Sequence, residues 1–307
     1  MTSHSSRNAN HRPLSVTIGD YPHTRRLKQA MSASQTQSFD FIDVKPISRA
    51  FAPMVRKLAY DISEMAIVTY FLARAAGVPI VLLPVALAAR YQEEALLCRA
   101  NDRSINGPES LAGKRVGVRA YSQTTAVWIR GILGDEFGLQ TEDLQWSVAE
   151  GSHVEGIEDP AHVRRIPDGG NLVDLLLDGE LDAVILGNDV PSDTRLRTVF
   201  PDTGAAARRF HTKHGFKPVN HVLVAKRSVA NDETETVLSF VAGLQESADA
   251  IAAATGVVLP CGRDELDPSL DLALRYSREQ GLVPHSMVLD DLWEGSPGEL
   301  RRMRATR

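Results

Sequence analysis

Short apolar runs suited to β-strands alternate with helix-like segments along most of the 307 residues. Residues 14–18 form the first such run, and residues 24–31 after it suit a helix. This alternation is typical of a mainly parallel sheet with helices on its faces. We therefore expect an α/β fold, and the length of the chain favours two domains over one.

The alternation also divides the chain into two units. Further strands are expected at residues 39–44, 60–63, 80–83, 95–98, 115–118, 183–186 and 219–225. Helices are expected at residues 49–58, 64–75, 171–177 and 234–253, and after a polar turn at residues 121–123. A new unit begins near Leu111, and the long helix 234–253 packs back on the first unit. We predict a discontinuous domain I (14–98 and 222–307), a domain II (99–221), a hinge and interdomain cleft where the chain crosses twice, and a polar tail (1–13).

Composition and charge limit the partners. The chain is 43% hydrophobic and carries a net charge of -5 without a Lys/Arg block, which predicts a small-molecule partner and neither nucleic acid nor membrane. Its most apolar region, residues 67–90, is interrupted by charged, Gly and Pro residues, so no transmembrane helix is expected. The polar first 13 residues lack the apolar core of a secretory signal, which predicts a cytoplasmic protein. Cys98 and Cys261 are expected to be buried thiols rather than a disulfide.

Ligands of two-domain α/β proteins bind beyond the carboxyl ends of the strands, so residues just after each strand are candidates. Asp20 and Tyr21 follow the first strand, and Arg25 one turn later is either a carboxylate clamp or a solvated helix charge. Ser63 and Glu64 are expected at a helix start, where Ser63 suits a cap. Glu64 is either a general acid or base with a raised pKa, or a first-turn carboxylate favoured by the helix dipole.

A run of polar residues precedes a firmly apolar helix in the second unit. Free N–H groups at a helix start, together with hydroxyls, form an anion site that suits a carboxylate or a phosphate. Ordinary capping by one Ser or Thr is the alternative. The residues are Tyr121, Ser122, Gln123, Thr124 and Thr125. Arg130 lies beyond the first turn of this helix and is expected to pair with a neighbouring acid.

The histidines and the absent motifs argue against cofactors. His211 and His214 are expected on a loop surface, and with His221 they lack the Cys or carboxylate pattern of a metal site, so no metal is expected. The sequence has no Gly-rich phosphate loop, dinucleotide fingerprint, nucleophile elbow or Cys-x-x-Cys pair. His221 opens an apolar strand, a position more often taken by a core histidine.

Several phrases, in order along residues 14–255, resemble one enzyme family. They are Gly19-Asp20-Tyr21 with Thr24-Arg25, YDISEM at residues 60–65, LAGKRVGV at 111–118, TAVWIRGIL at 125–133, GELDA at 179–183, FPD at 200–202 and PVNHV at 218–222. Together they resemble bacterial 4,5-dihydroxyphthalate decarboxylases. The resemblance implies a two-domain type II periplasmic-binding-protein-like fold that works as an enzyme, and it places His221 at the cleft floor.

The resemblance implies a cofactor-independent decarboxylase of a hydroxylated aromatic carboxylic acid, turning a 4,5-dihydroxyphthalate-like substrate into protocatechuate and CO2 in aromatic-compound and phthalate degradation. Such a reaction needs an acid for the ring carbon, a partner for the hydroxyl and donors for the spectator carboxylate. We expect His221 to be the acid and Glu64 with Asp20 to be the partner of the hydroxyl. The carboxylate is expected to be held by Arg25, Gln123, Thr124 and Thr125.

One departure from the family weakens the substrate inference. Where the decarboxylases carry a Phe-Arg-His-Ser phrase, this chain has Tyr91-Gln92-Glu93-Glu94. An added carboxylate near a dianionic substrate predicts slow turnover, or a preference for an acid with fewer negative charges. Two alternatives therefore stay open: a non-catalytic binding module for a small anionic or aromatic ligand, and another cytoplasmic enzyme on the same scaffold. Assembly into a homo-oligomer also stays open.

Overall fold

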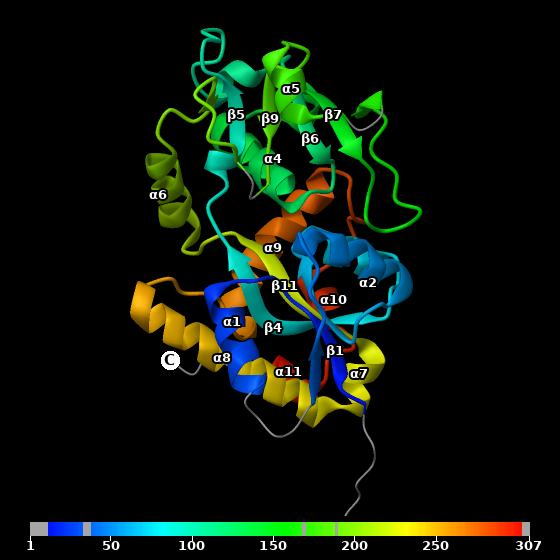
Figure 1. Cartoon of the computed structure of the whole chain (residues 1–307). Coiled ribbons are helices and arrows are strands. Elements are labelled where there is room, and N and C mark those ends of the chain that lie inside the picture. The colour runs from blue at the N-terminus through cyan, green and yellow to red at the C-terminus, as the bar shows by residue number, and fades with distance from the viewer. Residues whose placement is uncertain (1–11, 33–37, 168–169, 188–189, 303–307) are drawn as a thin grey trace, which may run out of the picture.

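The computed structural model describes residues 12–32, 38–167, 170–187 and 190–302, and it forms two α/β halves, one above the other (Figure 1). The sheet of the lower half, here the first domain, has the strand order β2-β1-β3-β11-β4. Strands β1, β2 and β3 run parallel, whereas β11 is antiparallel to both β3 and β4. The strands are β1 Leu14–Thr17, β2 Phe39–Phe41, β3 Ile62–Ala66, β4 Ile80–Ala89 and β11 Val219–Lys226. The helices are α1 Pro22–Ser32, η1 Ile47–Ala50, α2 Phe51–Lys57, α3 Ile67–Ala75, α7 Arg227–Asp232, α8 Thr234–Thr255, α9 Arg263–Glu279, α10 Leu289–Trp293 and α11 Gly298–Arg301.

The sheet of the upper half, the second domain, has the strand order β10-β5-β9-β6-β7-β8. Strand β6 is parallel to β7 and β9, and β5 is antiparallel to both of its neighbours. The strands are β5 Leu96–Arg99, β6 Arg115–Ala120, β7 Gln145–Glu150, β8 Arg164–Arg165, β9 Ala183–Ile185 and β10 Leu196–Thr198. The helices are η2 Glu93–Ala95, η3 Pro108–Leu111, α4 Thr124–Phe137, η4 Thr141–Asp143, α5 Leu172–Leu177 and α6 Thr203–His214.

Sheet membership places the crossings between the domains slightly earlier than the predicted boundaries. The boundary at residue 98 falls inside β5, which belongs wholly to the second sheet, and the boundary at 221 falls inside β11, which belongs to the first. The chain therefore crosses just before Leu96 and again just before Val219. The predicted polar tail, residues 1–13, lies outside the described residues except for Arg12 and Pro13.

Strand β3 is longer than expected, and this corrects the predicted helix start at Glu64. All five residues of β3 are buried, and β11 pairs with them as far as Ala66, opposite His221. Because this ladder satisfies the backbone of residues 64–66, the helix begins only at Ile67. Ser63 and Glu64 are therefore strand residues, and neither lies at a helix start.

Strand β4 is also longer than expected, because it continues through Pro84 to Ala89. Proline cannot donate to a ladder and is confined to edges or bulges. Here the register of β4 against β11 shifts between Val222 and Leu223, beside this proline. The longer strand carries Arg90 up to the junction between the domains.

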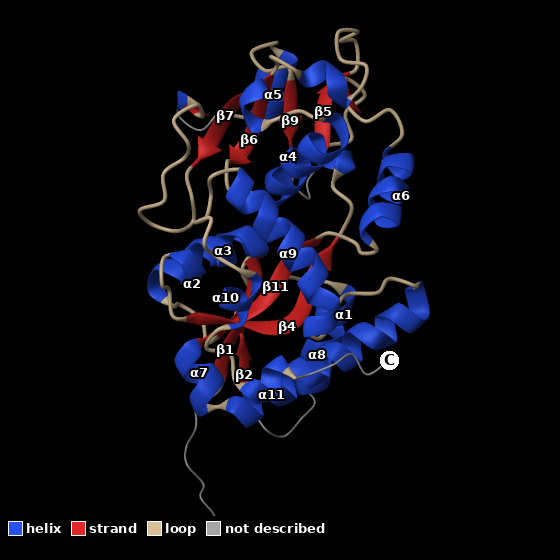
Figure 2. Cartoon of the chain, turned by 180° about the vertical axis from the view of Figure 1, so that it is seen from behind, coloured by secondary structure: helices blue, strands red, loops and turns tan. Residues whose placement is uncertain are grey.

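Helices α4 and α9 join the two halves across a shared core (Figure 2). The Trp128 indole of α4 donates to the Val219 carbonyl over 2.9 Å, and its ring meets the Tyr276 ring of α9 edge to face at 5.8 Å. Arg130 is buried at 3% exposure, and its guanidinium lies 4.0 Å from the centre of the Tyr121 ring. Its Nε donates to Gln280 Oε1 over 2.7 Å. The expected acidic partner of Arg130 is therefore replaced by an amide and an aromatic face, and burial lowers the pKa of Arg130 to about 10.

Helix α8 packs on the first domain as expected, mainly against α1. Among the described residues it is the one helix long and apolar enough to cross a membrane by length and composition. A core helix passes the same test, and α8 buries Val237, Phe240, Val241 and Leu244 in the core of the first domain. Cys98 and Cys261 are buried thiols rather than a disulfide, as predicted.

The packing of α4 on α9 predicts opposite effects for two glycines in one helix. A Cβ at Gly131 would lie 2.2 Å from the Tyr276 ring, whereas a Cβ at Gly134 would meet only the Leu139 carbonyl at 3.6 Å. We expect Gly131→Ala to lower the free energy of unfolding by about 1–3 kcal/mol through overpacking. Gly134→Ala, the matched control, should be neutral or raise it by about 0.5–1 kcal/mol. Urea unfolding of both variants measures the difference, and equal effects would contradict this account of the α4–α9 contact.

Candidate functional site

The site is built around Glu64, a carboxylate with no exposure in the middle of β3. Its Oε2 accepts from the Gly19 backbone N–H over 2.7 Å. Its Oε1 accepts from the Tyr21 hydroxyl over 2.7 Å and lies 2.6 Å from His221 Nδ1. Burial raises the pKa of Glu64, but the hydrogen bonds and charge from His221, followed by Tyr21 and Gly19, outweigh it and lower the pKa overall. Glu64 is therefore ionised, which is the opposite of the raised pKa expected for a general acid or base.

The turn after β1 explains how Tyr21 reaches Glu64. The Tyr21 ring folds back over Gly19 so closely that a Cβ there would lie 2.7 Å from it, so only glycine fits. Thr24 fixes the same turn, because its hydroxyl donates to the Gly19 carbonyl over 2.7 Å and accepts from the Tyr21 N–H over 2.8 Å. Burial, and then the Glu64 charge, raise the pKa of Tyr21, so it stays a phenol.

An ionised Glu64 fixes the tautomer of His221. Since a carboxylate only accepts, Nδ1 of His221 must carry the proton between them, and Nε2 is left for chemistry. The side chain is 14% exposed, so it sits at the edge of the buried cluster. The Phe51 ring meets the imidazole edge to face at 5.3 Å and holds its plane. His221 and Glu64 form a histidine–carboxylate pair of the kind that performs acid–base catalysis.

His23 is a second imidazole beside Glu64. It is buried at 6% exposure and stacks on Tyr21, with the ring centres 5.4 Å apart and the planes 7° from parallel. Burial lowers the pKa of His23, against an opposing effect of the Glu64 charge, so the ring is neutral. Its Nε2 is buried and has no hydrogen-bond partner among the described residues. A buried polar atom without a partner costs free energy that a ligand can restore.

A second cluster lies at the start of α4. Arg90 Nη2 donates to Thr125 Oγ1 and to the Gly187 carbonyl, both over 3.1 Å. Arg90 Nε and Gln123 Oε1 are buried without a partner among the described residues. Gln123 is the N-cap of α4, and its side chain does not cap the helix. A guanidinium beside uncapped N–H groups suits a carboxylate.

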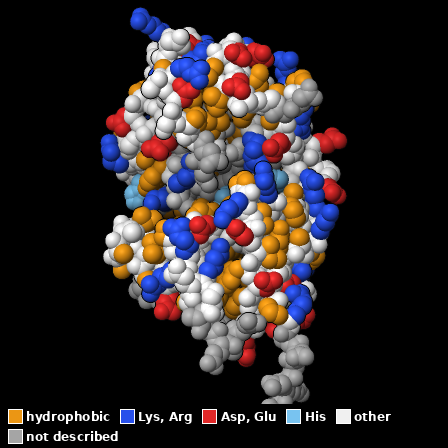
Figure 3. All heavy atoms as spheres, viewed as in Figure 1, with side chains coloured by type: hydrophobic (Ala, Val, Ile, Leu, Met, Phe, Trp, Pro, Cys, Tyr) orange, Lys and Arg blue, Asp and Glu red, His pale blue; other side chains and the backbone are white. Residues whose placement is uncertain are grey.

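The two clusters meet at the junction between the domains. Arg90 is two residues past Ala88, which pairs with His221 across the β4–β11 ladder. From the other side, Thr124 Oγ1 accepts from the Val68 N–H over 3.3 Å, two residues beyond the end of β3. Figure 3 shows Lys and Arg side chains gathered along this waist of the molecule. The junction therefore brings a histidine–carboxylate pair close to a helix start with donors suited to an anion.

Some residues predicted from sequence lie elsewhere. Asp20 and Arg25 form an ion pair of 3.1 Å with both side chains about half exposed, so Arg25 already has a carboxylate partner. Ser63 is fully buried and its hydroxyl donates to the Glu64 carbonyl, so it caps no helix. Tyr121 is fully buried beneath Arg130 and belongs to the core. Ser122 is 8% exposed at the same turn as Gln123.

Two further histidines singled out from the sequence are His211 and His214. Among the described residues no group of His, Cys, Asp or Glu is arranged to hold a metal ion. His211 and His214 lie on α6 rather than on a loop, because the helix continues to His214 and ends at the left-handed Gly215. His214 packs against Phe210, with the ring centres 4.5 Å apart.

Sequence reasoning missed Arg90, His23 and Phe51. Arg90 was overlooked because β4 was expected to end at residue 83, seven residues earlier. His23 sits next to the quoted Gly-Asp-Tyr phrase, so its position could have been noticed. Nothing in the sequence places Phe51 against His221, because 170 residues separate them along the chain.

The stretch that departs from the family has a structural role. The Gln92 and Asn220 side-chain amides exchange two hydrogen bonds of 2.9 and 3.1 Å in the core. Glu93 is 2% exposed, burial raises its pKa, and its charged neighbours are Glu136 and Arg209. Glu136 is in the last turn of α4, about 20 Å along the helix from its start. Glu93 therefore does not face the anion site, contrary to the repulsion expected from the sequence.

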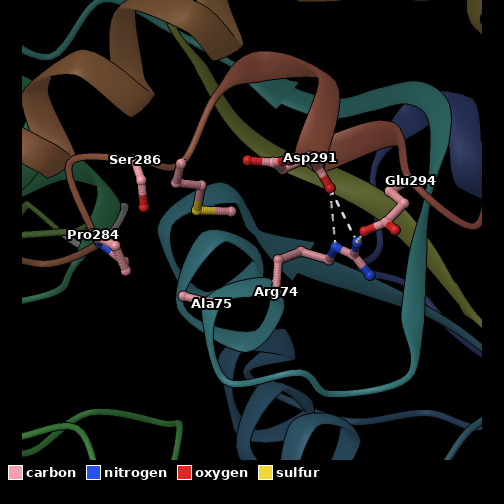
Figure 4. Close-up of a pocket in the computed structure, with 7 residues that line it drawn as sticks. Arg74, Ala75, Pro284, Ser286, Asp291 and Glu294 are labelled. Carbon is pink, nitrogen blue, oxygen red and sulfur yellow. Dashed lines mark hydrogen bonds and ion pairs between the residues drawn. The ribbon is translucent and has the colours of Figure 1, made fainter.

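A separate open pocket lies at the far end of α3, and Figure 4 shows its lining. Arg74 crosses it and donates to the Asp291 carbonyl over 3.0 and 3.2 Å and to Glu294 over 3.1 Å. None of the predicted site residues lines it. Its arginine is held by structural contacts, so the pocket is no candidate active site.

Two α/β domains with a polar site at their junction define the type II periplasmic-binding-protein fold, as expected. The chain resembles the alkanesulfonate-binding protein SsuA of Xanthomonas axonopodis pv. citri bound to MOPS, with a TM-score of 0.59 and 12% identity, covering 91% of this chain and 97% of that one. It also resembles the desulfurization enzyme DSZB, with a TM-score of 0.54 and 15% identity over 94% and 98% of the two chains. At these identities the likeness shows the fold alone, and no family model matches the sequence.

Relatives in sequence are more specific. The chain is 30% identical over 303 residues to the 4,5-dihydroxyphthalate decarboxylase of Comamonas testosteroni, covering 90% of this chain and 89% of the relative. It is 33% identical over 187 residues to the enzyme of that name from Pseudomonas putida, covering 58% and 71%. The chain belongs to the 4,5-dihydroxyphthalate decarboxylase family, which confirms the resemblance in its sequence phrases.

The buried Glu64 carboxylate predicts a pH-dependent stability difference. Glu64→Gln removes the charge that three donors satisfy, and we expect it to cost about 3 kcal/mol near neutral pH. Tyr21→Phe removes one of the three donors and should cost less, about 1.5 kcal/mol. The pKa of Glu64 is lower in the folded state than its unfolded value of about 4.3. The contribution of Glu64 to the free energy of unfolding is therefore complete above a pH of about 4.3, and it is lost as the pH falls towards the lower, folded-state pKa. Urea unfolding at pH 7 and pH 3 measures this, and a Glu64→Gln difference that did not shrink in acid would contradict an ionised Glu64.

Proposed function

We propose that the chain is a cofactor-independent decarboxylase of a hydroxylated aromatic carboxylate. The observation that carries this is the His221–Glu64 pair at the junction of the domains. His221 pairs with Ala88 in the sheet, two residues before Arg90, and Arg90 binds Thr125 at the start of α4. One cluster can move a proton and the other can hold a carboxylate. Membership of the decarboxylase family supports the reaction class.

The proposed reaction begins at the substrate hydroxyl. Neutral His23, whose Nε2 lacks a partner, accepts the proton of a hydroxyl para to the departing carboxylate. The phenolate pushes electron density onto the ring carbon that bears that carboxylate. Tyr21 stacks on His23 and keeps it beside the ionised Glu64. This assigns the hydroxyl to His23, since both Glu64 oxygens are occupied and Asp20 is paired with Arg25.

His221 completes the reaction as the acid. Its Nδ1 is bound to the Glu64 carboxylate, and a proton on Nε2 is delivered to the ring carbon. The bond to the carboxylate then breaks, its electron pair returns to the ring, and CO2 leaves. His23 returns its proton to the phenolate oxygen, and His221 regains one from water. The net change is consumption of one proton and replacement of the carboxylate by hydrogen.

The spectator carboxylate is assigned to the second cluster. Arg90 Nε and the first N–H groups of α4 offer donors, and Thr124 and Thr125 line the same helix start. Burial lowers the pKa of Arg90, against the Glu94 charge, and a bound carboxylate would compensate for that desolvation. Since Glu93 does not face the anion site, Glu93 itself does not argue against a dicarboxylate.

Turnover of 4,5-dihydroxyphthalate to protocatechuate, followed by absorbance, tests the reaction. We expect activity in the wild-type chain and a fall in kcat of about 10²–10⁴-fold in His221→Gln, the range for a general acid. The exposed His211→Gln is the matched control and should keep full activity. No turnover across a panel of hydroxybenzoates would exclude the decarboxylase and favour a binding module.

A comparison of two arginines tests the carboxylate site. Arg90→Ala should weaken binding of an aromatic dicarboxylate by about 1.5–3 kcal/mol, the range for hydrogen bonds to charged groups. Arg25→Ala is the matched comparison, because its guanidinium is half exposed and already paired with Asp20. Calorimetry with a non-reacting analogue measures both affinities. A larger loss in Arg25→Ala would return the carboxylate to the site first expected from the sequence.

A further inference from the structure

A loop of the second domain is docked on the first domain near His221. Residues 151–155 follow β7, and Arg56 of α2 binds their backbone. Arg56 Nε donates to the His153 carbonyl over 2.7 Å, and Nη2 donates to the Ser152 carbonyl over 3.1 Å. Glu155 adds an ion pair of 3.8 Å with Arg56. One arginine side chain therefore binds three residues of this docking loop, Ser152, His153 and Glu155.

The His153 side chain makes a second attachment. Its Nδ1 lies 3.1 Å from Thr69 Oγ1, in the first turn of α3, and Thr69 is only 3% exposed. Burial, and then the charges of Arg119 and Arg56, lower the pKa of His153 to about 4. The ring is therefore neutral when the loop is docked, as required beside two guanidinium groups. His153 thus anchors the loop as a neutral side chain, through a hydrogen bond to Thr69 and a ring contact with Phe51.

Phe51 lies between His153 and His221, the acid of the proposed reaction. It is 2% exposed at the start of α2. The Phe51 ring meets the His153 ring at 5.8 Å and 78°, and it meets the His221 ring at 5.3 Å and 85°. Each imidazole therefore rests on the same phenyl ring. Removal of His153 would leave Phe51 without one of its two aromatic neighbours.

We propose that docking of residues 151–155 holds His221 in its reactive orientation through Phe51, so that His153 and Phe51 are positioning residues. The inference rests on the proposed function, because it takes His221 as the acid. Glu64 fixes one nitrogen of the imidazole, but a ring held at one atom can still rotate about that hydrogen bond. The edge contact with Phe51 removes this freedom, and the docked loop keeps Phe51 in place.

The same docking also joins the two clusters of the site. Thr69, which holds His153, is adjacent in the chain to Val68, whose N–H donates to Thr124 at the start of α4. The first turn of α3 therefore contacts both the docking loop and the anion-binding helix start. A carboxylate bound at α4 and a docked loop would support each other, because both need α3 in one position.

The experiment compares two arginines from successive elements, Arg49 of η1 and Arg56 of α2. Arg56→Ala removes the docking bonds, whereas Arg49→Ala removes an exposed arginine whose hydrogen bond reaches only the Lys45 carbonyl. Hydrogen exchange of residues 151–155 reports docking, and ¹⁵N spectra of the histidine side chains report the environment of His221. In Arg56→Ala we expect exchange in the loop to be about tenfold faster and the His221 signals to shift. Arg49→Ala should match the wild-type chain in both. Unchanged His221 signals in an undocked Arg56→Ala variant would overturn the proposal.

A substitution pair at Thr69 tests the same point without changing charge. Thr69→Val removes the hydroxyl that His153 contacts, and Thr69→Ser restores it. We expect Thr69→Val to lower kcat by about tenfold or more with a smaller change in KM, since it misaligns a reacting group. Thr69→Ser should recover most of the loss. Equal kcat values in the two variants would overturn the positioning role.

The two levels of inference fail in different ways. If the wild-type chain decarboxylates no hydroxybenzoate, the proposed function fails, whereas the spectra of Arg56→Ala still decide whether docking orients His221. If turnover is normal in Arg56→Ala and Thr69→Val while loop exchange rises, the decarboxylase stands and the positioning role is excluded.

Discussion

The ionised Glu64 carboxylate, buried without exposure in a central strand, is the constraint on which the first domain depends. An unpaired charge in such a position would cost many kcal/mol, so every donor around it is obligatory. The donors come from two segments far apart in the chain: the turn after β1 supplies Gly19 and Tyr21, and β11 supplies His221. The order β1-β3-β11 in the sheet is what allows both segments to reach the strand between them. The demand for a paired charge and the demand for a fixed imidazole are therefore met by the same contacts.

The return of the chain through β11 extends this constraint to the junction of the domains. The residue before His221 is Asn220, whose amide is bound to Gln92, and the Val219 carbonyl accepts from Trp128 of α4. One short strand thus fixes the acid of the proposed reaction and the helix whose start forms the anion site. In the second domain, a buried guanidinium plays the corresponding part, because Arg130 holds Tyr121 against α9 through Gln280. Glu64 is held by Gly19, Tyr21 and His221, whereas Arg130 is held by the Gln280 side chain and the Tyr121 carbonyl.

The sequence was most informative where local pattern decides structure. The alternation of strands and helices, the return of the chain near residue 219, and the polar start of α4 all follow from residue spacing. It was misleading where tertiary contacts override local preference. Glu64 resembled a helix-start carboxylate because nothing local shows that β11 will pair with residues 64–66 and keep them in the strand. Tyr121 resembled a ligand residue because Arg130, which lies over its ring, comes nine positions later in the chain and was expected to pair with an acid.

Arg90 was missed because a proline normally ends a strand. Strand β4 continues past Pro84 only because its register against β11 shifts there. Phe51 contacts the rings of His153 and His221, which lie far from it along the chain, so the sequence does not connect them.

The way the domains are joined bears on the proposed reaction, because it fixes the acid relative to the carboxylate site. In a simple hinge protein the two crossings alone connect the domains, and closure moves one whole domain. In this chain the back of the junction is also filled by α4 and α9, where Gly131 allows Tyr276 to approach the helix backbone and Trp128 covers the crossing at Val219. Side chains packed this tightly transmit strain rather than yield, so the back of the junction is rigid. On the other side of the junction, Arg56 and Thr69 of the first domain hold residues 151–155. A proton donor must be held within about 0.5 Å of its productive position, a tolerance that a freely swinging domain would not meet. The packed back of the junction limits movement between the proposed acid and the helix start of α4, and the docked loop adds a contact that holds His221 through Phe51.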